Sequence, residues 1–170
     1  MNTTETIRAR RSVRKYQPGM AIPKEHLDLM LEAAMCAPSA CNSRPWEFVV
    51  VESADIRKKI TKIHPYCRSL PDASLGIVVC GNPNALPNVP AEGFWPQDCA
   101  AATQNLLLQA TELGYGTCWC GIYPDKDRSM AFAKLLGVTT VPFCLILVGT
   151  ADEQPAQRGF YDPSRVRYLR

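Results

Sequence analysis

Residues 98–113 constrain the fold more than any other segment, because their pattern predicts a long helix that is buried on most of its sides. Asp98 is a candidate cap for this helix, and Gly114 directly follows its last residue. The small and apolar side chains of the segment include Ala101, Ala102, Leu106, Ala110 and Leu113. A helix of this kind has to be covered by other elements of the fold.

The remaining elements are helices and strands in alternation. Helical spacing and capping residues predict helices from Thr3 or Thr4 to residue 10, over residues 23–37, from Ser53 or Asp55 to residue 63, and over residues 128–136. Apolar runs predict strands over residues 48–51, 75–80, 117–122 and 143–148. The proline-rich residues 82–97 predict a long irregular loop.

The tail over residues 152–170 is polar, aromatic and basic, with no core pattern of its own. We therefore expect it to pack on something else. The chain has 170 residues, which predicts one domain spanning residues 1–170.

The composition, 46% hydrophobic and 21% charged, is that of a soluble globular protein. No apolar run approaches the roughly 20 residues of a membrane span, and no signal-peptide region is recognisable, so we expect a cytoplasmic protein. The net charge of +3 is small and locally concentrated, which argues against a nucleic-acid binder. The eight cysteines lack the spacing of a disulfide framework or a zinc site. We expect reduced thiols, many of them in the core, and no bound metal.

Two segments carry most of the functional signal. Residues 10–14 offer three guanidinium groups and a hydroxyl, which predicts a local anion site; a solvated basic turn is the alternative. Residues 38–46 form a loop of small residues that leads into an apolar strand, a common place for a ligand. Within it, the side chain of Asn42 either forms hydrogen bonds to the polar edge of a cofactor, with its donor and its acceptor, or stabilises the turn. We expect Trp46 to lie in the core.

The first segment has the pattern Arg-x-Ser-x-Arg, the second has Pro-Ser-x-x-Asn-x-x-Pro-Trp, and residues 98–119 follow as a long helix and a turn. In this order and spacing the chain closely resembles the FMN-dependent nitroreductase family over nearly its whole length. The resemblance implies an α+β fold with a mixed β-sheet flanked by helices. It also implies a homodimer in which the C-terminal extension packs on the partner subunit.

The resemblance implies FMN as the cofactor and assigns residues to it in four groups. The phosphate and the N1–O2 edge of the ring would be bound by Arg10, Arg11, Ser12 and Arg14. The loop that reaches the flavin of the other subunit would supply Pro38, Ser39, Ala40, Asn42 and Arg44, the last at a position that is often Gln in the family. The backbone near N5 would belong to Trp119, Cys120 and Gly121. The phosphate site would be closed by Arg158, with Arg165 or Arg167 as substitutes.

The resemblance further implies an oxidoreductase that passes hydride from NAD(P)H to electron-poor acceptors such as nitroaromatics or quinones, by a ping-pong mechanism. Because the flavin carries this chemistry, we predict no catalytic side chain, and we expect His26 and His64 to be structural or surface residues. Phe94 and Trp95 are candidate walls of the substrate space. A non-enzymatic flavin-binding or storage protein, or a specialised flavin-using enzyme on the same scaffold, is the alternative.

Overall fold

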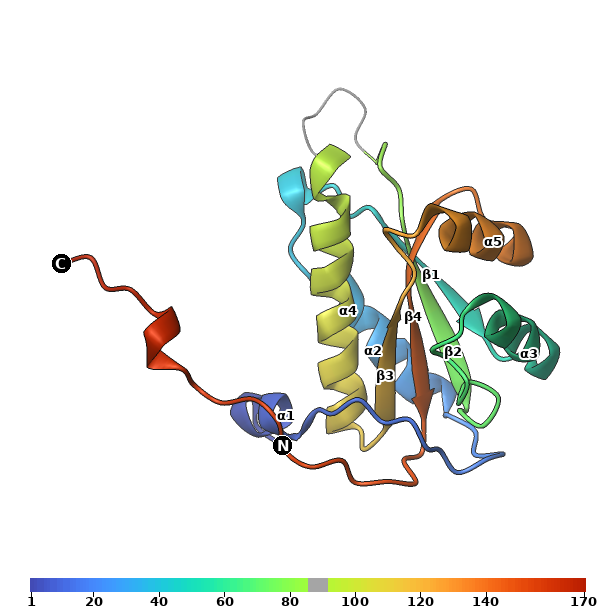
Figure 1. Ribbon diagram of the computed structural model, residues 1–170, viewed down its shortest axis with the longest axis horizontal. Helices are drawn as coiled ribbons and strands as arrows, with labels where there is room; N and C mark the ends of the chain where they lie inside the picture. The colour runs from blue at the N-terminus through green and yellow to red at the C-terminus, as the bar shows by residue number, and fades with distance from the viewer. Residues whose placement is uncertain (86–91) are drawn as a thin grey trace.

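The computed structural model describes residues 1–85 and 92–170 (Figure 1). Its helices are α1 (Thr3–Ala9), α2 (Lys24–Met35), α3 (Ala54–Ile63), α4 (Trp95–Glu112) and α5 (Lys126–Leu136). Its strands are β1 (Trp46–Val51), β2 (Leu75–Gly81), β3 (Gly116–Gly121) and β4 (Val141–Gly149). Short 3-10 helices occur at η1 (Ala40–Asn42), η2 (Glu92–Phe94) and η3 (Pro163–Arg165).

A four-stranded sheet in the order β1-β2-β4-β3 forms the centre of the fold. All three strand pairs are antiparallel, and Ile77 of β2, for example, lies opposite Ile146 of β4. β2 is buried along its whole length, as its continuous apolar run predicts. Among the described residues, parallel pairing is limited to an isolated bridge between Ser12 and Thr117. β3 therefore forms one edge of the sheet, and the bridge lies at the start of that edge.

Helices cover both faces of this sheet (Figure 1). α2 and α4 pack on one face, where Met30 and Leu106 join Ile146 in a buried cluster. α3 and α5 cover the other face, where Phe132 packs with Leu145. The predicted α+β fold with a sheet flanked by helices is confirmed, while the three pairs of described strands are all antiparallel rather than mixed. α4, which packs on one face of the sheet, is the segment that the sequence predicted to be buried.

α4 begins three residues earlier than its sequence pattern predicts. Its first turn contains Pro96, which is favoured there because its missing N–H would have no helical partner. The prediction that Asp98 caps this helix was wrong: Asp98 lies inside the first turn, and its carboxylate binds another segment. The predicted irregular loop over residues 82–97 was also wrong at its end, since helical structure starts at Glu92; its residues 86–91 lie outside the described part.

Other helix ends follow their capping side chains. Asn2, rather than Thr3 or Thr4, caps α1, because its side chain and that of Glu5 each accept a hydrogen bond from the other residue's backbone N–H. α5 starts at Lys126, two residues before the predicted Arg128. Asp125 caps it, because its side chain accepts a hydrogen bond from the Arg128 backbone N–H. The helix ends at Leu136 and is followed by Gly137, whose φ of 69° is the left-handed conformation that a terminating glycine supplies.

The sequence-based expectations for the core hold in detail. Six of the eight cysteines are buried, and Cys36 and Cys41 are exposed. Trp46 is 9% exposed and belongs to the cluster beneath α2 and α4. In the two described ranges, 1–85 and 92–170, no helix has both the length and the apolar character that crossing a bilayer requires.

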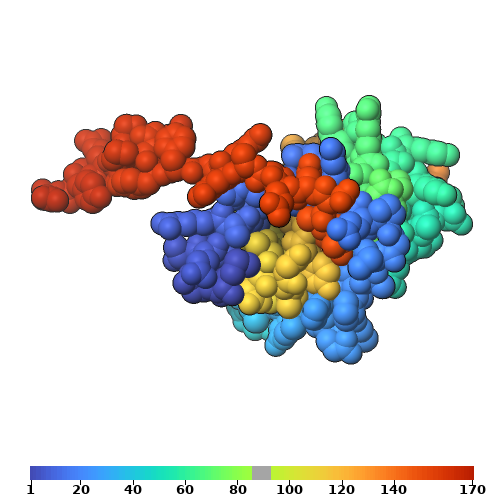
Figure 2. Space-filling view, turned by 90° about the horizontal axis from the view of Figure 1, so that it is seen from below, coloured from blue at the N-terminus to red at the C-terminus, as the bar shows by residue number. Residues whose placement is uncertain are grey.

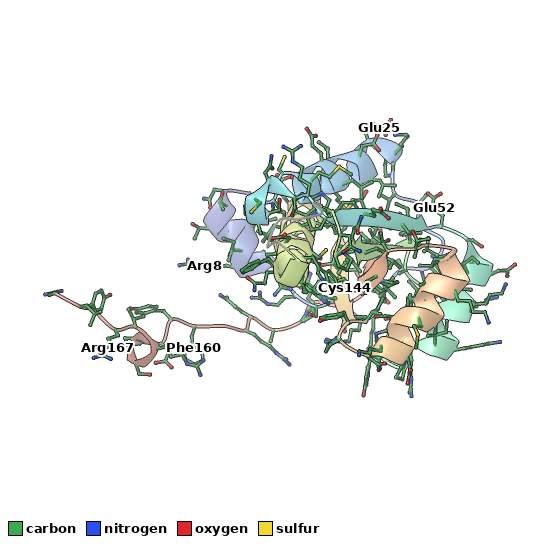
Figure 3. All side chains as sticks on the ribbon, turned by 90° about the horizontal axis from the view of Figure 1, so that it is seen from above. Arg8, Glu25, Glu52, Cys144, Phe160 and Arg167 are labelled. Atoms are coloured by element: carbon green, nitrogen blue, oxygen red, sulfur yellow. The ribbon has the colours of Figure 1, made fainter. Side chains whose placement is uncertain are left out.

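The C-terminal tail leaves the body and extends into solvent (Figures 1 and 2). Its large hydrophobic side chains are strongly exposed: Phe160 at 87%, Tyr161 at 71%, Tyr168 at 70% and Leu169 at 85%. Figure 3 places Phe160 and Arg167 well away from Cys144, which lies in the core. The prediction that the tail has no core of its own is confirmed.

Candidate functional site

The basic segment, residues 10–16, runs from the end of α1 along the outer edge of β3. The Val13 backbone N–H donates to the Thr117 carbonyl at 2.8 Å, and Tyr16 forms a bridge with Ala151. Val13 and Tyr16 are 6% and 4% exposed, so their side chains anchor the segment in the core. This anchoring leaves Arg14, which lies between them, exposed and directed into a cavity at the edge of the sheet.

This cavity, which we call the β3 cavity, has a volume of about 910 Å³. Its lining residues are Arg14, His64, Pro65, Tyr66, Arg68, Ser69, Asp72, Cys118, Trp119, Cys120 and Gly121. The structure thus brings together four of the residues that the sequence assigned to the cofactor, one from the basic segment and three from β3. The two arginines give it a net positive character that suits an anionic or electron-rich ligand edge.

The backbone of β3 contributes a row of polar groups to this cavity. In an antiparallel pair alternate residues direct their N–H and C=O groups away from the partner strand. Ile122 donates to Phe143 of β4, whereas Thr117 accepts from Val13 on the outer edge. By this alternation Trp119 and Gly121 also direct their backbone groups outward. The Trp119 indole packs on Phe143, with ring centroids 5.9 Å apart, so Trp119 contributes backbone to the cavity edge.

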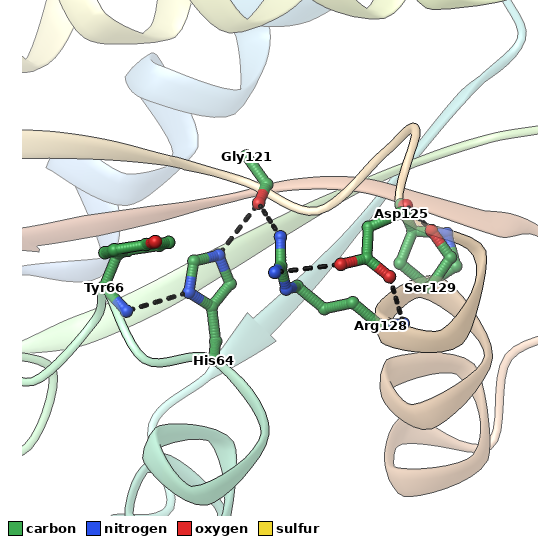
Figure 4. Close-up of polar contacts among 7 residues, drawn as sticks. His64, Tyr66, Gly121, Asp125, Arg128 and Ser129 are labelled. Carbon is green, nitrogen blue, oxygen red and sulfur yellow. Dashed lines mark hydrogen bonds and ion pairs between the residues drawn. The ribbon is translucent and has the colours of Figure 1, made fainter.

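Seven of the lining residues were not predicted from sequence: Cys118 of β3, and His64, Pro65, Tyr66, Arg68, Ser69 and Asp72. All of them except Cys118 belong to the turn between α3 and β2. A run of polar residues after Pro65 and before a buried strand was the available signal, because ligand-binding side chains are concentrated in such loops. His64 itself is buried and structural, as expected, with its Nε2 2.8 Å from the Gly121 carbonyl oxygen (Figure 4). His26, also expected to be structural or at the surface, is partly buried and contacts the Tyr115 hydroxyl at 2.8 Å.

Two thiols lie at the floor of the cavity. Cys118 and Cys120 lie on the same face of β3 and are each 4% exposed. The neighbouring Cys120 thiol and the charge of Arg14 hold the pKa of Cys118 below its usual value in spite of burial. The presence of Cys118 and burial raise the pKa of Cys120, whose thiol donates to the Tyr66 carbonyl at 3.5 Å. Cys118 is therefore the member of the pair that ionises first.

The predicted loop, residues 38–46, is strained. Cys41, Asn42 and Arg44 have φ values of 52°, 53° and 47°, which non-glycine residues seldom adopt. The Arg44 backbone N–H donates to Ser39 Oγ at 3.0 Å, and its Nε donates to Asn42 Oδ1 at 3.0 Å. The loop thus closes on itself through its own polar side chains.

Asp98 ties this loop to the start of α4. Its carboxylate accepts hydrogen bonds from the Ala40 backbone N–H at 3.0 Å and from Ser43 Oγ at 3.4 Å. Asp98 is 6% exposed, so this is a buried attachment. None of the loop residues assigned to the cofactor, Pro38, Ser39, Ala40, Asn42 and Arg44, lines the β3 cavity.

The other predicted site residues are placed as follows. Arg11 Nε donates to the Ala156 carbonyl at 3.2 Å and so holds the start of the tail. Arg158 is exposed on that tail, and Arg165 pairs with Asp162 at 3.1 Å. Phe94 is 47% exposed. Trp95 is 8% exposed and lines a second cavity of about 680 Å³, where it packs on Tyr123 at a ring distance of 4.8 Å.

Comparison with known proteins places this arrangement in a family. The model of the Nitroreductase family matches residues 7–75 and 65–150. A Methanothermobacter thermautotrophicus protein named "Putative NADH dehydrogenase/NAD(P)H nitroreductase" is 42% identical over 168 residues, 98% of this chain and 86% of its own.

Solved structures agree with the sequence matches. A Parabacteroides distasonis protein with the same printed name superposes with a TM-score of 0.90 at 34% identity, covering 99% of this chain and 98% of its own. A Clostridium difficile structure titled "FMN-dependent Nitroreductase" gives a TM-score of 0.86 at 27% identity and covers 99% of both chains.

Proposed function

The chain belongs to the nitroreductase family, and from this premise we propose that it is an FMN-dependent oxidoreductase that passes hydride from NAD(P)H to electron-poor acceptors such as nitroaromatics or quinones. The observation that carries the proposal is the β3 cavity, where the Arg14 guanidinium shares one space with the outward backbone of Trp119 and Gly121. Similarity to a protein named as an NAD(P)H nitroreductase and to one named as an FMN-dependent nitroreductase supports it.

The residues of the cavity fit a flavin ring. A Cβ added to Gly121 would meet nothing within 4 Å, so the space beside this residue is open and its backbone can be approached closely. Arg14 is exposed on its anchored segment, and Arg68 also lines the cavity. We assign Arg14 to the N1–O2 edge and the Trp119, Cys120 and Gly121 backbone to N5, with Arg10, Arg11 and Ser12 at the phosphate and Arg158 closing that site.

Bound FMN supplies the hydride chemistry, and the protein sets its position and its electrostatic environment. With FMN bound, the Arg14 guanidinium would lie at the N1–O2 edge and would stabilise negative charge there. The Gly121 N–H would offer a donor to N5. Because one cavity has to admit both the hydride donor and the acceptor, they bind in turn, and ping-pong kinetics follow. Phe94 and Trp95 remain candidate walls for the acceptor.

A homodimer completes this site in our proposal. The strained loop presents Ser39, Asn42 and Arg44 outside the cavity of its own chain, so we assign them to the flavin of the partner. The exposed aromatic side chains of the tail supply apolar area that a partner subunit would cover.

Identification of the bound cofactor tests the proposal. Heat-released material from the purified protein, separated against standards, is expected to be FMN, because the basic segment offers one cluster for one phosphate. FAD, or no flavin even after reconstitution with FMN, would overturn it. FMN that NADH and NADPH never reduce would indicate a flavin store in place of an enzyme.

A further inference from the structure

One polar network beside the β3 cavity has no part in the roles assigned above. The Gly121 carbonyl oxygen accepts two hydrogen bonds, from His64 Nε2 at 2.8 Å and from an Arg128 guanidinium nitrogen at 3.2 Å (Figure 4). The donors come from two elements: His64 directly follows α3, and Arg128 lies in the first turn of α5. A β3 residue at the edge of the cavity is therefore held from both helices on that face.

His64 has one defined protonation state in this network. The Tyr66 backbone N–H donates to His64 Nδ1 at 3.2 Å, so Nδ1 carries no proton and Nε2 is the donor to Gly121. The ring is 1% exposed and packs edge-on against Phe132 at 6.2 Å. Burial lowers the pKa of His64, which keeps the ring neutral.

Asp125 fixes the position of the Arg128 side chain. One Asp125 carboxylate oxygen lies 2.9 Å from the guanidinium, and the other accepts the Arg128 backbone N–H at 3.0 Å. The guanidinium therefore cannot leave the Gly121 carbonyl without weakening an ion pair at the capped end of α5.

We propose that His64 and Arg128 are positioning residues that fix the Gly121 backbone so that its N–H faces flavin N5; this rests on the function proposed above. Gly121 is the last residue of β3, opposite Cys144 of β4, and it has no side chain to pack and open space beside it. Two donors on its carbonyl add a restraint on the backbone at this end of the strand. Through Gly121, His64 and Arg128 determine the strength of the hydrogen bond to N5 without contacting the cofactor themselves.

Two neutral substitutions at one position separate this role from a general structural one. In His64→Gln, the side-chain amide can still donate to Gly121 from near the Nε2 position. In His64→Asn, the shorter side chain can accept the Tyr66 N–H but cannot reach Gly121 with a donor. Both variants lose the same ring packing, and each keeps a different one of the two hydrogen bonds: Gln keeps the bond to Gly121, and Asn keeps the bond from Tyr66.

The test measures the Gly121 carbonyl carbon chemical shift, the Kd of oxidised FMN and the flavin midpoint potential in the full-length chain. We expect His64→Asn to move the carbonyl shift and to weaken oxidised FMN binding about three- to tenfold, the range of one net hydrogen bond. We also expect it to raise the midpoint potential, because the Gly121 N–H donates to N5 of the oxidised ring and its loss destabilises the oxidised state most. His64→Gln should keep all three near the wild-type values. Arg128→Met should move them in the same direction as His64→Asn.

Ser129→Ala is the matched control, since it removes the hydrogen bond from Ser129 Oγ to the Pro142 carbonyl at the same end of α5. It should change neither the Gly121 shift nor the potential. Equal potentials in His64→Asn and His64→Gln, or an unchanged Gly121 shift in His64→Asn and Arg128→Met, would overturn the proposal. A wild-type chain that binds no FMN would overturn the proposed function instead, and the Gly121 shift in the unloaded chain would still report whether the restraint exists.

Discussion

The basic segment and the loop over residues 38–46 are assigned to the same cofactor, yet the structure holds them in opposite ways. The basic segment is anchored by backbone pairing with β3 and by buried side chains, and it places Arg14 in the cavity of its own chain. The loop is held through the Asp98 carboxylate and contributes no residue to that cavity. This difference is the basis of our proposal that one half of the site is completed within the chain and the other half serves a second copy.

The strain in the loop supports the same division. Three non-glycine residues in the left-handed region cost on the order of 1–3 kcal/mol each, and such conformations persist where the surroundings fix them. Asp98 and the hydrogen bonds of Ser39 and Asn42 fix the loop in this conformation, in which we propose that it contacts the cofactor of the partner.

Removal of the tail should have the largest effect on dimer formation and FMN binding. A chain that ends at Gly159 loses the exposed Phe160, Tyr161, Tyr168 and Leu169, so we expect it to be monomeric and to lose FMN at the same time. Light scattering and flavin absorbance on one preparation measure both properties. A truncated protein that stays dimeric and fully yellow would contradict the role of the tail.

Asp98→Ala should release the loop while it leaves the basic segment in place. It removes the acceptor of the Ala40 N–H and Ser43 hydroxyl, which predicts a loss of about 2–4 kcal/mol in the free energy of unfolding and a ten- to hundredfold loss of FMN affinity, roughly. Denaturant unfolding and flavin titration measure the two effects. Asp98→Asn, which keeps one acceptor oxygen, is the control with a smaller loss, and unchanged FMN affinity in Asp98→Ala would separate the loop from the cofactor.

Within the basic segment, Arg10→Ala and Arg14→Ala should have different effects. Loss of a charge-assisted hydrogen bond costs about 1.5–3 kcal/mol, so Arg10→Ala is expected to weaken FMN binding tenfold or more, roughly. Arg14→Ala should mainly lower the midpoint potential, because it removes positive charge from beside N1. Flavin titration and potentiometry compare them, and equal effects of both variants on both quantities would refute the division of roles.

The smallest effect concerns pH. The pKa of His64 is lowered by burial, so the unfolded chain binds a proton there more readily than the folded chain. Stability from neutral His64 is complete above pH 6.5, the ordinary histidine value, and is lost as the pH falls below it, by at most about 1.4 kcal/mol per pH unit. Urea unfolding between pH 7 and pH 5 should show a shallower loss in His64→Gln than in wild type. If wild type and His64→Gln lose the same free energy of unfolding between pH 7 and pH 5, His64 is charged in the folded state, contrary to the prediction.

The sequence predicted the elements whose signal is local. The apolar run of β2, the glycine that follows α5 and the lack of a core of its own in the tail follow from residue pattern alone. The prediction that Asp98 caps α4 was wrong, because a carboxylate at a helix start can accept hydrogen bonds either from its own helix or from a distant segment. Which of the two it binds depends on how η1 packs against α4, and this cannot be read from the local sequence. His64, Arg68 and Asp72 were missed as cavity residues since their position depends on how the turn after α3 folds against β3.

The central claim is that one site is built from two chains, and subunit complementation tests it most directly. Arg10→Ala/Arg14→Ala damages the basic segment, and Ser39→Ala/Asn42→Ala damages the loop, so each variant alone should bind FMN weakly. After the two are mixed and their subunits are exchanged, half of the dimers are hybrids and each hybrid has one intact site. We therefore expect tight FMN binding to return to about one quarter of the sites. No recovery in verified hybrid dimers would contradict the account, because it would place both halves of the site in the same chain.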